Sequence, residues 1–483
     1  MEARALFRAI SVLLSIVATF MLACLILGLF IGEGQNALSI FLPPILGGYT
    51  LFLLSLIISS RSIVLSQRSG YLFVVLSWLS AAVLGAIPFF LAGFSLSPAA
   101  AFFESMSGFT TTGATILTDV EALPRSLLLW RATTHWLGGM GIVVLTVAIF
   151  PLLGISGRTP MEAESPGPQV DKFTPRLSHT ASILWLIYLV LTLILTVLLL
   201  FGGMDWFDAV THAFATMATG GFSTRNASVG AFDSAYIQIV LTVFMILAGT
   251  SFTIHWRVLT GKTRDALRDS EWRVYISIIV VASVLIWIAL IHSGISRSIW
   301  DHLRHACFQV ASIITTTGFA TEDYLFWPDF GQTVLFALMF VGGCAGSTAG
   351  GIKVGRIVTL FKMAQAEMKY LLNPRGVYGI FVNRRYMKKQ IVYDIAAMVY
   401  LFLGVSLVST LVVSSAGYDI LTSLTATLAT QGNIGPGFSL VGPACNYAFF
   451  PDWIKTWLSF MMLVGRLEVY TVLVLLTRAF WKR

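Results

Sequence analysis

The chain has 483 residues, of which 57% are hydrophobic and 11% charged, and its formal net charge is +8. Soluble domains carry about 25% charged residues, so the composition excludes an ordinary soluble protein and requires lipid as part of the solvent. The positive charge is spread over alternate loops, a distribution that argues against a nucleic-acid-binding surface and favours a membrane protein.

Long apolar runs recur along the whole chain and approach the roughly 20 residues that a helix needs to span the hydrocarbon core. Backbone groups in lipid must be hydrogen bonded within the protein, and these runs are too long and too continuously apolar for barrel strands. We therefore predict helices, the first of them a retained membrane anchor. The runs are residues 12–30, 39–58, 70–90, 127–153, 182–200, 235–254, 274–291, 333–341, 391–413 and 457–476.

Basic and acidic residues alternate between successive loops. Lysine and arginine gather at residues 4–8, 61–68, 158–176, 257–273 and 353–389 and at the C-terminus. Since cytoplasmic loops carry the excess of basic residues, the pattern predicts that both termini lie in the cytoplasm. The opposite face would carry more acids and so raise the local concentration of cations.

A short motif recurs four times in the predicted outward loops, each time between two apolar runs. Its glycines are 108, 97 and 114 residues apart (221−113, 318−221, 432−318). The four copies are Thr111, Thr112 and Gly113; Thr219, Gly220 and Gly221; Thr316, Thr317 and Gly318; and Thr430, Gln431 and Gly432.

The repeated motif predicts an all-α polytopic membrane protein with four helix–pore-loop–helix repeats in a pseudo-fourfold arrangement. We expect an N-terminal transmembrane helix pair at 1–66 before the repeats. The predicted repeats are residues 67–157, 180–262, 272–364 and 390–483.

The motif has the chemistry of a cation filter. A dehydrated potassium ion needs oxygen ligands, which filters supply as rings of backbone carbonyls and threonine hydroxyls. Glycine tolerates the unusual backbone course that inward-pointing carbonyls require. A short helix before each turn would direct its partly negative C-terminal end toward the pore. The alternative for any single copy is a glycine that merely ends a helix.

Two features within the later apolar runs are candidates for a gate. The glycines at 342, 343, 346, 350 and 351 each weaken a helix by roughly 1 kcal/mol against alanine, so the segment predicts a broken helix of the kind found in transport pathways. Close helix packing through small residues remains the alternative. Arg466 is a charge within the last run and a functional candidate by default. A structural ion pair with Glu468 is the other interpretation.

Over nearly its whole length the sequence resembles the Trk/Ktr/HKT superfamily of potassium transporters, most closely the bacterial TrkH type. In that superfamily the filter-loop glycines determine selectivity, so the resemblance implies potassium ions held by the filter residues and no covalent cofactor. Gly220 and Gln431 depart from a Thr-Thr-Gly pattern and leave the symmetry of the ring in doubt.

The resemblance also implies the roles of the gate candidates and the partners. The segment with Gly342, Gly343, Gly346, Gly350 and Gly351 would be an intramembrane loop that blocks the pore below the filter, and Arg466 would face the pore as an electrostatic barrier. A TrkA-like cytosolic ring of nucleotide-binding regulatory subunits, a homodimer and a location in the bacterial inner membrane are implied in the same way.

Two other functions stay open at this point. A sodium-coupled symporter would show inverted repeats with two matched broken helices, whereas these repeats share one orientation and only one helix looks strongly broken. A membrane-embedded enzyme would need a cluster of acidic or histidine side chains within the spanning segments, where we find chiefly Arg466 and Glu468. The four cysteines lack ligand-type spacing, so we expect neither a disulfide framework nor a metal cluster.

Overall fold

The computed structural model describes residues 2–58, 66–94, 96–141, 177–294, 297–383 and 385–482. Within these ranges nearly all regular structure is helical, and the strands are confined to one short hairpin. The predicted run 127–153 is described only as far as residue 141, and the whole basic segment 158–176 lies outside the described residues.

Among the described residues, six helices are long and apolar enough to cross a membrane. Many of their large apolar side chains are exposed, as expected for surfaces that face lipid. The protein is therefore a multi-pass membrane protein. The six helices are α1 (Glu2–Ile31), α2 (Gly34–Ile58), α3 (Gln67–Leu91), α8 (Leu177–Phe201), α13 (Ser270–His292) and α17 (Lys389–Ser414).

After the α1–α2 pair, one unit occurs four times: a long helix, a short helix and a second helix that ends early. The long members are α3, α8, α13 and α17. The short members are α4 (Pro98–Phe109), α9 (Trp206–Met217), α14 (Ile299–Ile314) and α18 (Ile420–Gln431). The second helices are α5 (Arg125–Gly139), α10 (Ala235–Ala248), α15 (Asp329–Leu338) and α19 (Asp452–Arg466).

The short helices begin at the polar residues that favour a helix start. Ser97 and Asp419 accept hydrogen bonds from the Ala100 and Thr422 amides at 3.1 and 2.9 Å, and Ser298 accepts one from Trp300 at 3.3 Å. Asp205 stands at the same position before α9. Three of the four short helices thus start with a side-chain cap, and the fourth has a residue of the same type in place without that hydrogen bond.

Breaks in the second helices are more frequent than the sequence suggests. The helix pair α10 and α11 (Phe252–Leu259) bends by 97°, and α19 and the following segment (Tyr470–Leu476) bend by 113°. The expectation of only one strongly broken helix is therefore wrong. The physical reason is close approach to a short helix: a methyl group on Gly465, at the end of α19, would lie 1.8 Å from the Gln431 carbonyl oxygen, and one on Gly249, which follows α10, would lie 2.8 Å from the Thr315 side chain.

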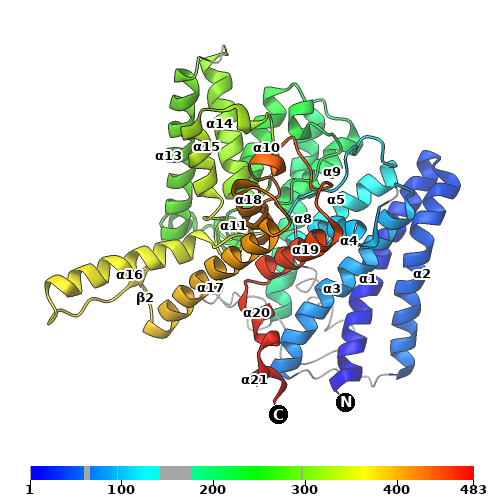
Figure 1. Cartoon of the computed structure of the whole chain (residues 1–483), viewed down its shortest axis with the longest axis horizontal. Helices are drawn as coiled ribbons and strands as arrows, with labels where there is room; N and C mark the ends of the chain where they lie inside the picture. Colours follow the sequence, from blue (N-terminus) through cyan, green and yellow to red (C-terminus); the bar gives the residue numbers. More distant parts are fainter. Residues whose placement is uncertain are drawn as a thin grey trace.

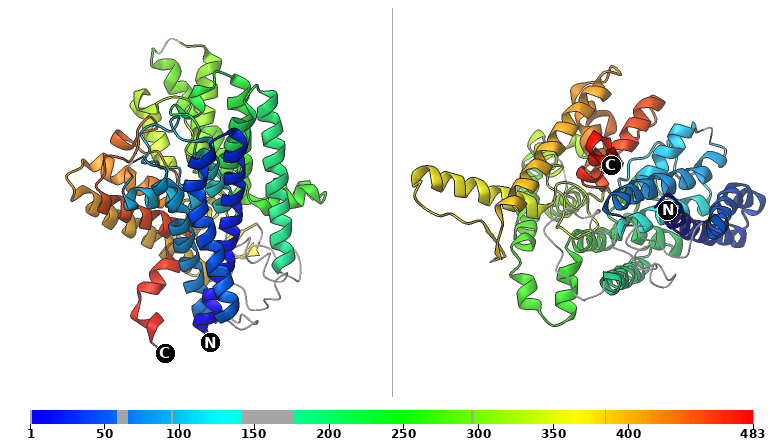
Figure 2. Two further views of the ribbon diagram at one scale, coloured as in Figure 1. Left: turned by 90° about the vertical axis from the view of Figure 1, so that its right-hand side faces the viewer. Right: turned by 90° about the horizontal axis from the view of Figure 1, so that it is seen from below.

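Four further helices and one strand hairpin complete the described part of the chain. They are α12 (Thr263–Leu267), α16 (Val354–Leu372), β1 (Phe381–Val382), β2 (Arg385–Tyr386), α20 (Tyr470–Leu473) and α21 (Arg478–Trp481), with short 3-10 turns at Ser228–Ala231, Tyr324–Phe326, Ser439–Val441 and Val474–Leu476. The strands pair antiparallel, Phe381 with Tyr386. Figure 1 shows α16 projecting from the bundle as an arm, and both termini at the same end of the molecule. The views in Figure 2 agree.

Candidate functional site

Two residues after the end of each short helix, the chain has a positive φ angle, a conformation that costs a residue other than glycine about 1–3 kcal/mol. The four residues are Thr111 (53°), Thr219 (55°), Thr316 (56°) and Asn433 (54°). In each case the next residue donates its amide hydrogen to a carbonyl five residues back, as Thr112 does to Ser107 at 2.9 Å and Ile434 to Ala429 at 2.8 Å. The four turns share one geometry, and such strain is typical of functional sites.

One glycine follows two residues after each of these turns, and the four glycines close a ring. They are Gly113, Gly221, Gly318 and Gly435, with φ angles of 79°, 80°, 82° and 97°. A methyl group on each would meet a carbonyl oxygen of the next segment: Gly220 at 2.1 Å, Thr317 at 2.0 Å, Ile434 at 2.2 Å and Thr112 at 2.6 Å, in that order. Only glycine fits such contacts. We call residues 111–113, 219–221, 316–318 and 433–435 the four ring segments.

The fourth ring segment differs from the sequence prediction of Thr430, Gln431 and Gly432. Thr430 and Gln431 belong to α18, and Gly432 has an ordinary φ of −79° at its end. The Gln431 amide contacts α17, where it donates to the Phe402 carbonyl at 2.9 Å and accepts from the Ser406 hydroxyl at 2.9 Å. The turn geometry that the other three segments share lies three residues later, at Asn433, because asparagine tolerates positive φ and takes the place of the threonine.

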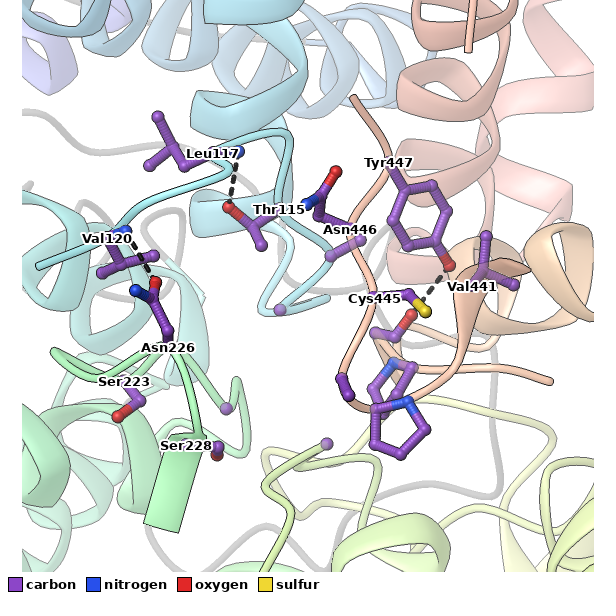
Figure 3. A pocket seen from close by; sticks show the side chains of 18 of the residues that line it. Thr115, Leu117, Val120, Ser223, Asn226, Ser228, Val441, Cys445, Asn446 and Tyr447 are labelled. Carbon is purple, nitrogen blue, oxygen red and sulfur yellow. Dashed lines mark hydrogen bonds between the residues drawn. The ribbon is translucent and has the colours of Figure 1, made fainter. Parts of the chain in front are cut away.

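The ring faces a cavity of about 130 Å³ on the side away from the termini. Its lining includes all four ring glycines and residues from the loops after the short helices. Figure 3 shows Thr115, Asn226 and Tyr447 reaching this cavity from three different loops. The Tyr447 hydroxyl donates to the Gly435 carbonyl at 2.8 Å and so holds the fourth segment.

Two ion pairs support the first two ring segments. Arg131 donates to Glu104 at 2.7 Å, and both side chains are buried. Glu104 also accepts from the Thr115 hydroxyl, while Arg131 donates to the Ser223 carbonyl at 2.9 Å, so the pair joins the ends of segments one and two. A buried charge of either sign is costly without such a partner. Nearer the surface, Arg225 contacts Asp208 at 2.9 Å.

The outer loops of the first two repeats are also tied together. The Asn226 side chain accepts from the Val120 amide at 2.8 Å and donates to Asp119 at 2.9 Å. This hydrogen bond from Asn226 lowers the pKa of the exposed Asp119 carboxyl below its usual value. The carboxylate is therefore a negative charge near the cavity at neutral pH.

The glycine-rich segment 342–351 lies directly against the ring on its other side. The Gly350 amide donates to the Thr316 hydroxyl at 2.7 Å, and a methyl group on Gly350 would lie 2.4 Å from the Gly432 carbonyl oxygen. Gly342, Gly346 and Gly351 have positive φ angles of 77°, 74° and 72°, while Gly343 packs against Gly249. The structure thus brings the predicted gate glycines next to the ring.

Arg466 joins this segment to the first repeat. Its guanidinium donates to the carbonyls of Thr348 at 2.8 Å, Gly138 at 2.6 Å and Gly139 at 2.9 Å. The Glu468 carboxylate accepts from Arg356. Arg466 therefore contacts both the glycine-rich segment, at Thr348, and the end of α5.

Glu271, at the start of α13, holds the backbone within the glycine-rich segment and just after it. Its carboxylate accepts from the amides of Ala345 at 2.6 Å and Gly355 at 2.8 Å. The preceding Asp269 accepts from Asn383, in the turn between β1 and β2, at 2.9 Å. The anchor of the segment is thus in contact with the hairpin beside the α16 arm.

Sequence reasoning missed Asn433, Ile434 and Gly435, the Glu104–Arg131 pair and Glu271. The sequence did contain a signal for Asn433, because in three repeats the ring turn lies a fixed number of residues after the start of its short helix. The spacing is 14 residues from Ser97 to Thr111, from Asp205 to Thr219 and from Asp419 to Asn433 (111−97, 219−205, 433−419). Glu104 and Arg131 lie in different helices and Glu271 lies in a charged stretch, so nothing local in the sequence shows which groups they contact.

The ring carries oxygen atoms that suit a bound cation. It presents backbone carbonyls from four segments, and the Thr111 hydroxyl and the Asn433 amide oxygen are buried without a hydrogen-bond partner in the described part of the chain. Oxygen ligands of this kind suit a dehydrated alkali cation. Four pore-loop repeats around such a ring define the chain as a pore-loop membrane transport protein.

Comparison with known proteins agrees with this class. The family model "TrkH: Cation transport protein" matches residues 50–482, so the chain belongs to the TrkH family. It is 41% identical over 428 residues to the Trk system potassium uptake protein TrkH of Escherichia coli K12, covering 86% of this chain and 87% of that protein. It is 34% identical to TrkI of Halomonas elongata, covering 99% and 96%.

A solved structure gives the same result for the fold. The crystal structure of the potassium transporter TrkH from Vibrio parahaemolyticus superimposes with a TM-score of 0.88 at 36% identity, covering 100% of both chains. The predicted all-α fold with pseudo-fourfold repeats and the predicted family resemblance are confirmed.

Proposed function

We propose that this protein takes up potassium across the bacterial inner membrane through the four-segment ring, which acts as its selectivity filter. The observation that carries the proposal is ring closure: each ring glycine approaches a carbonyl of the next segment, and the fourth returns to the first. The relatives in Escherichia coli and Halomonas elongata are potassium uptake proteins by name, which supports potassium as the ion.

The filter consists of Thr111, Thr112 and Gly113, of Thr219, Gly220 and Gly221, of Thr316, Thr317 and Gly318, and of Asn433, Ile434 and Gly435. Their carbonyls replace the water shell of the ion. The short helices end at the ring, so their partly negative C-terminal ends favour a cation there. Asp119 adds a negative charge beside the outer cavity.

The glycine-rich segment 342–351 is the gate of this pore. The hydrogen bond from Gly350 to Thr316 caps one of the four turns, which supports a closed pore. Arg466 sets a fixed positive charge below the filter and holds the gate through Thr348. When the segment leaves, ions flow passively, driven by about 2.3 kcal/mol per charge per 100 mV of membrane potential.

A cytosolic nucleotide-binding subunit of the TrkA type regulates the gate, and the chain works as a homodimer with both termini in the cytoplasm. The relatives are components of Trk systems, which supports a regulatory partner. The contact between Asn383 in the hairpin and Asp269, two residues before Glu271, supports a connection from the cytoplasmic end to the gate.

The sodium-coupled symporter is not favoured. The additional breaks in the second helices occur in repeats of the same orientation and follow the same close approach to a short helix. That arrangement accounts for the breaks without inverted repeats.

The test is rubidium-tracer uptake into proteoliposomes that hold the purified chain, with potassium, sodium and lithium as competitors. We expect potassium to compete strongly and sodium weakly. Equal competition by the three ions would refute the potassium filter. Uptake that requires a sodium gradient would favour the symporter.

A further inference from the structure

The four ring segments are not supported in the same way. In the first and third, the hydroxyl of the middle threonine bonds to that of the threonine ending the short helix, Thr112 with Thr110 at 2.8 Å and Thr317 with Thr315 at 2.7 Å. The second segment has Ala218 and Gly220 at these places. It therefore lacks both hydroxyls, and another group has to fill the space behind its backbone.

That group is the imidazole of His135, which comes from α5 of the first repeat. Its side chain is buried, and a methyl group on Gly220 would lie 2.3 Å from its Nδ1. The Phe222 amide points toward Nδ1 at 3.4 Å. The imidazole ring stacks on the Phe222 ring with centroids 4.0 Å apart and planes inclined by 14°.

The same phenylalanine is held by the buried ion pair. The Arg131 guanidinium, one helical turn before His135, lies 3.6 Å from the centre of the Phe222 ring, a cation–π contact. His135 and Arg131 thus fix the residue that follows Gly221. Segment two is positioned by side chains of the neighbouring repeat, whereas segments one and three are positioned by their own threonines.

We infer that His135 is a positioning residue that sets the ion selectivity of the second filter segment, acting through Gly220. This rests on the proposed filter function. The Gly220 carbonyl is the atom that Gly113 approaches, so a shift of Gly220 changes the ring at the contact between segments one and two. Residue 220 is a glycine, and so breaks the Thr-Thr-Gly pattern, because the imidazole of His135 occupies the space that a threonine side chain would need.

The experiment compares His135→Ala, Gly220→Thr and the double variant in the proteoliposome assay, with the ratio of sodium to potassium inhibition constants as the readout. Gly220→Thr should abolish uptake, because its side chain overlaps the imidazole. His135→Ala should keep uptake but lower the ratio by about tenfold, equivalent to about 1.4 kcal/mol. In the double variant the threonine occupies the vacated space, so uptake should return.

His292→Ala, at an exposed histidine near the end of α13, is the matched control and should keep the wild-type ratio. A His135→Ala protein with a wild-type ratio but a lower unfolding temperature would make His135 a packing residue only and overturn the inference. If that variant does not fold, Gly220→Ala replaces it, because its methyl group would press on the same imidazole. A lower ratio is then the expected result, and a wild-type ratio would overturn the inference. A wild-type protein that fails to distinguish the two ions would instead refute the proposed filter itself.

Discussion

The ring and the glycine-rich segment beneath it are both irregular backbone at membrane depth, but they are held differently. Each ring segment contacts the next, and further support comes from the threonine pairs, the Glu104–Arg131 ion pair and Tyr447. The segment 342–351 is held by Glu271, through the amides of Ala345 and Gly355, and meets the ring through the hydrogen bond from Gly350 to Thr316. Under the proposed function, the ring selects the ion and must not shift, whereas the glycine-rich segment opens and must detach at small cost.

The largest effect should come from the ring glycines. Gly435→Ala places a methyl group 2.6 Å from the Thr112 carbonyl oxygen at a φ of 97°. We expect rubidium uptake to fall about a hundredfold, the scale of about 3 kcal/mol of strain. Gly404→Ala, in open space on α17, should keep uptake unchanged.

Gly432→Ala in the same assay tests whether the fourth filter segment is 430–432, as the sequence predicts, or 433–435, as we propose. Its φ of −79° suits alanine, although the methyl group would lie 2.7 Å from the Leu428 carbonyl oxygen, so the loss should be smaller than for Gly435→Ala. The reverse ranking would return the filter to Thr430, Gln431 and Gly432 and contradict the ring described above.

Shortening the glycine-rich segment should raise ion flux, whereas Gly435→Ala should lower it. Removing residues 345–348 deletes the contacts of Thr348 with the Met217 and Ala248 carbonyls and with Arg466. At about 1 kcal/mol for each lost hydrogen bond, flux without a regulatory partner should rise about tenfold or more. Unchanged flux from a normally inserted protein would show that the segment does not close the pore.

Arg466→Ala should raise flux about fivefold, because it breaks the link between Thr348 and the end of α5 and removes a positive charge from the pore. Arg466→Lys keeps the charge but cannot reproduce the forked contacts, so it should fall between wild type and alanine. Single-channel recording measures both. Wild-type currents from Arg466→Ala would leave the arginine a structural role only.

The smallest effect should come from Glu271, whose carboxylate holds the backbone of the glycine-rich segment. Glu271→Gln weakens the two charge-assisted bonds to Ala345 and Gly355 without removing the acceptor, so open probability should rise about twofold. Glu367→Gln, an exposed residue on α16, makes the same charge change elsewhere and should leave gating unaltered. Equal behaviour of the two variants would remove Glu271 from the gate.

The sequence was sufficient for the helices and for three ring segments, since apolar length and a repeated Thr-x-Gly need no tertiary information. At the fourth segment the predicted motif, Thr430 to Gly432, lies three residues before the turn with the shared geometry, which Asn433 carries. The support of the ring could not be predicted, because Glu104, Arg131 and His135 come together only when neighbouring repeats pack. The breaks after α10 and α19 likewise depend on contacts between helices.

The most direct test of the ring is a crystal of the protein grown in rubidium and examined by anomalous diffraction at the rubidium edge. We expect ion density on the axis of the ring, contacted by the carbonyl oxygens of Thr112, Gly220, Thr317 and Ile434. Density beside Thr430–Gly432 with none between these four carbonyls would contradict the four-segment filter.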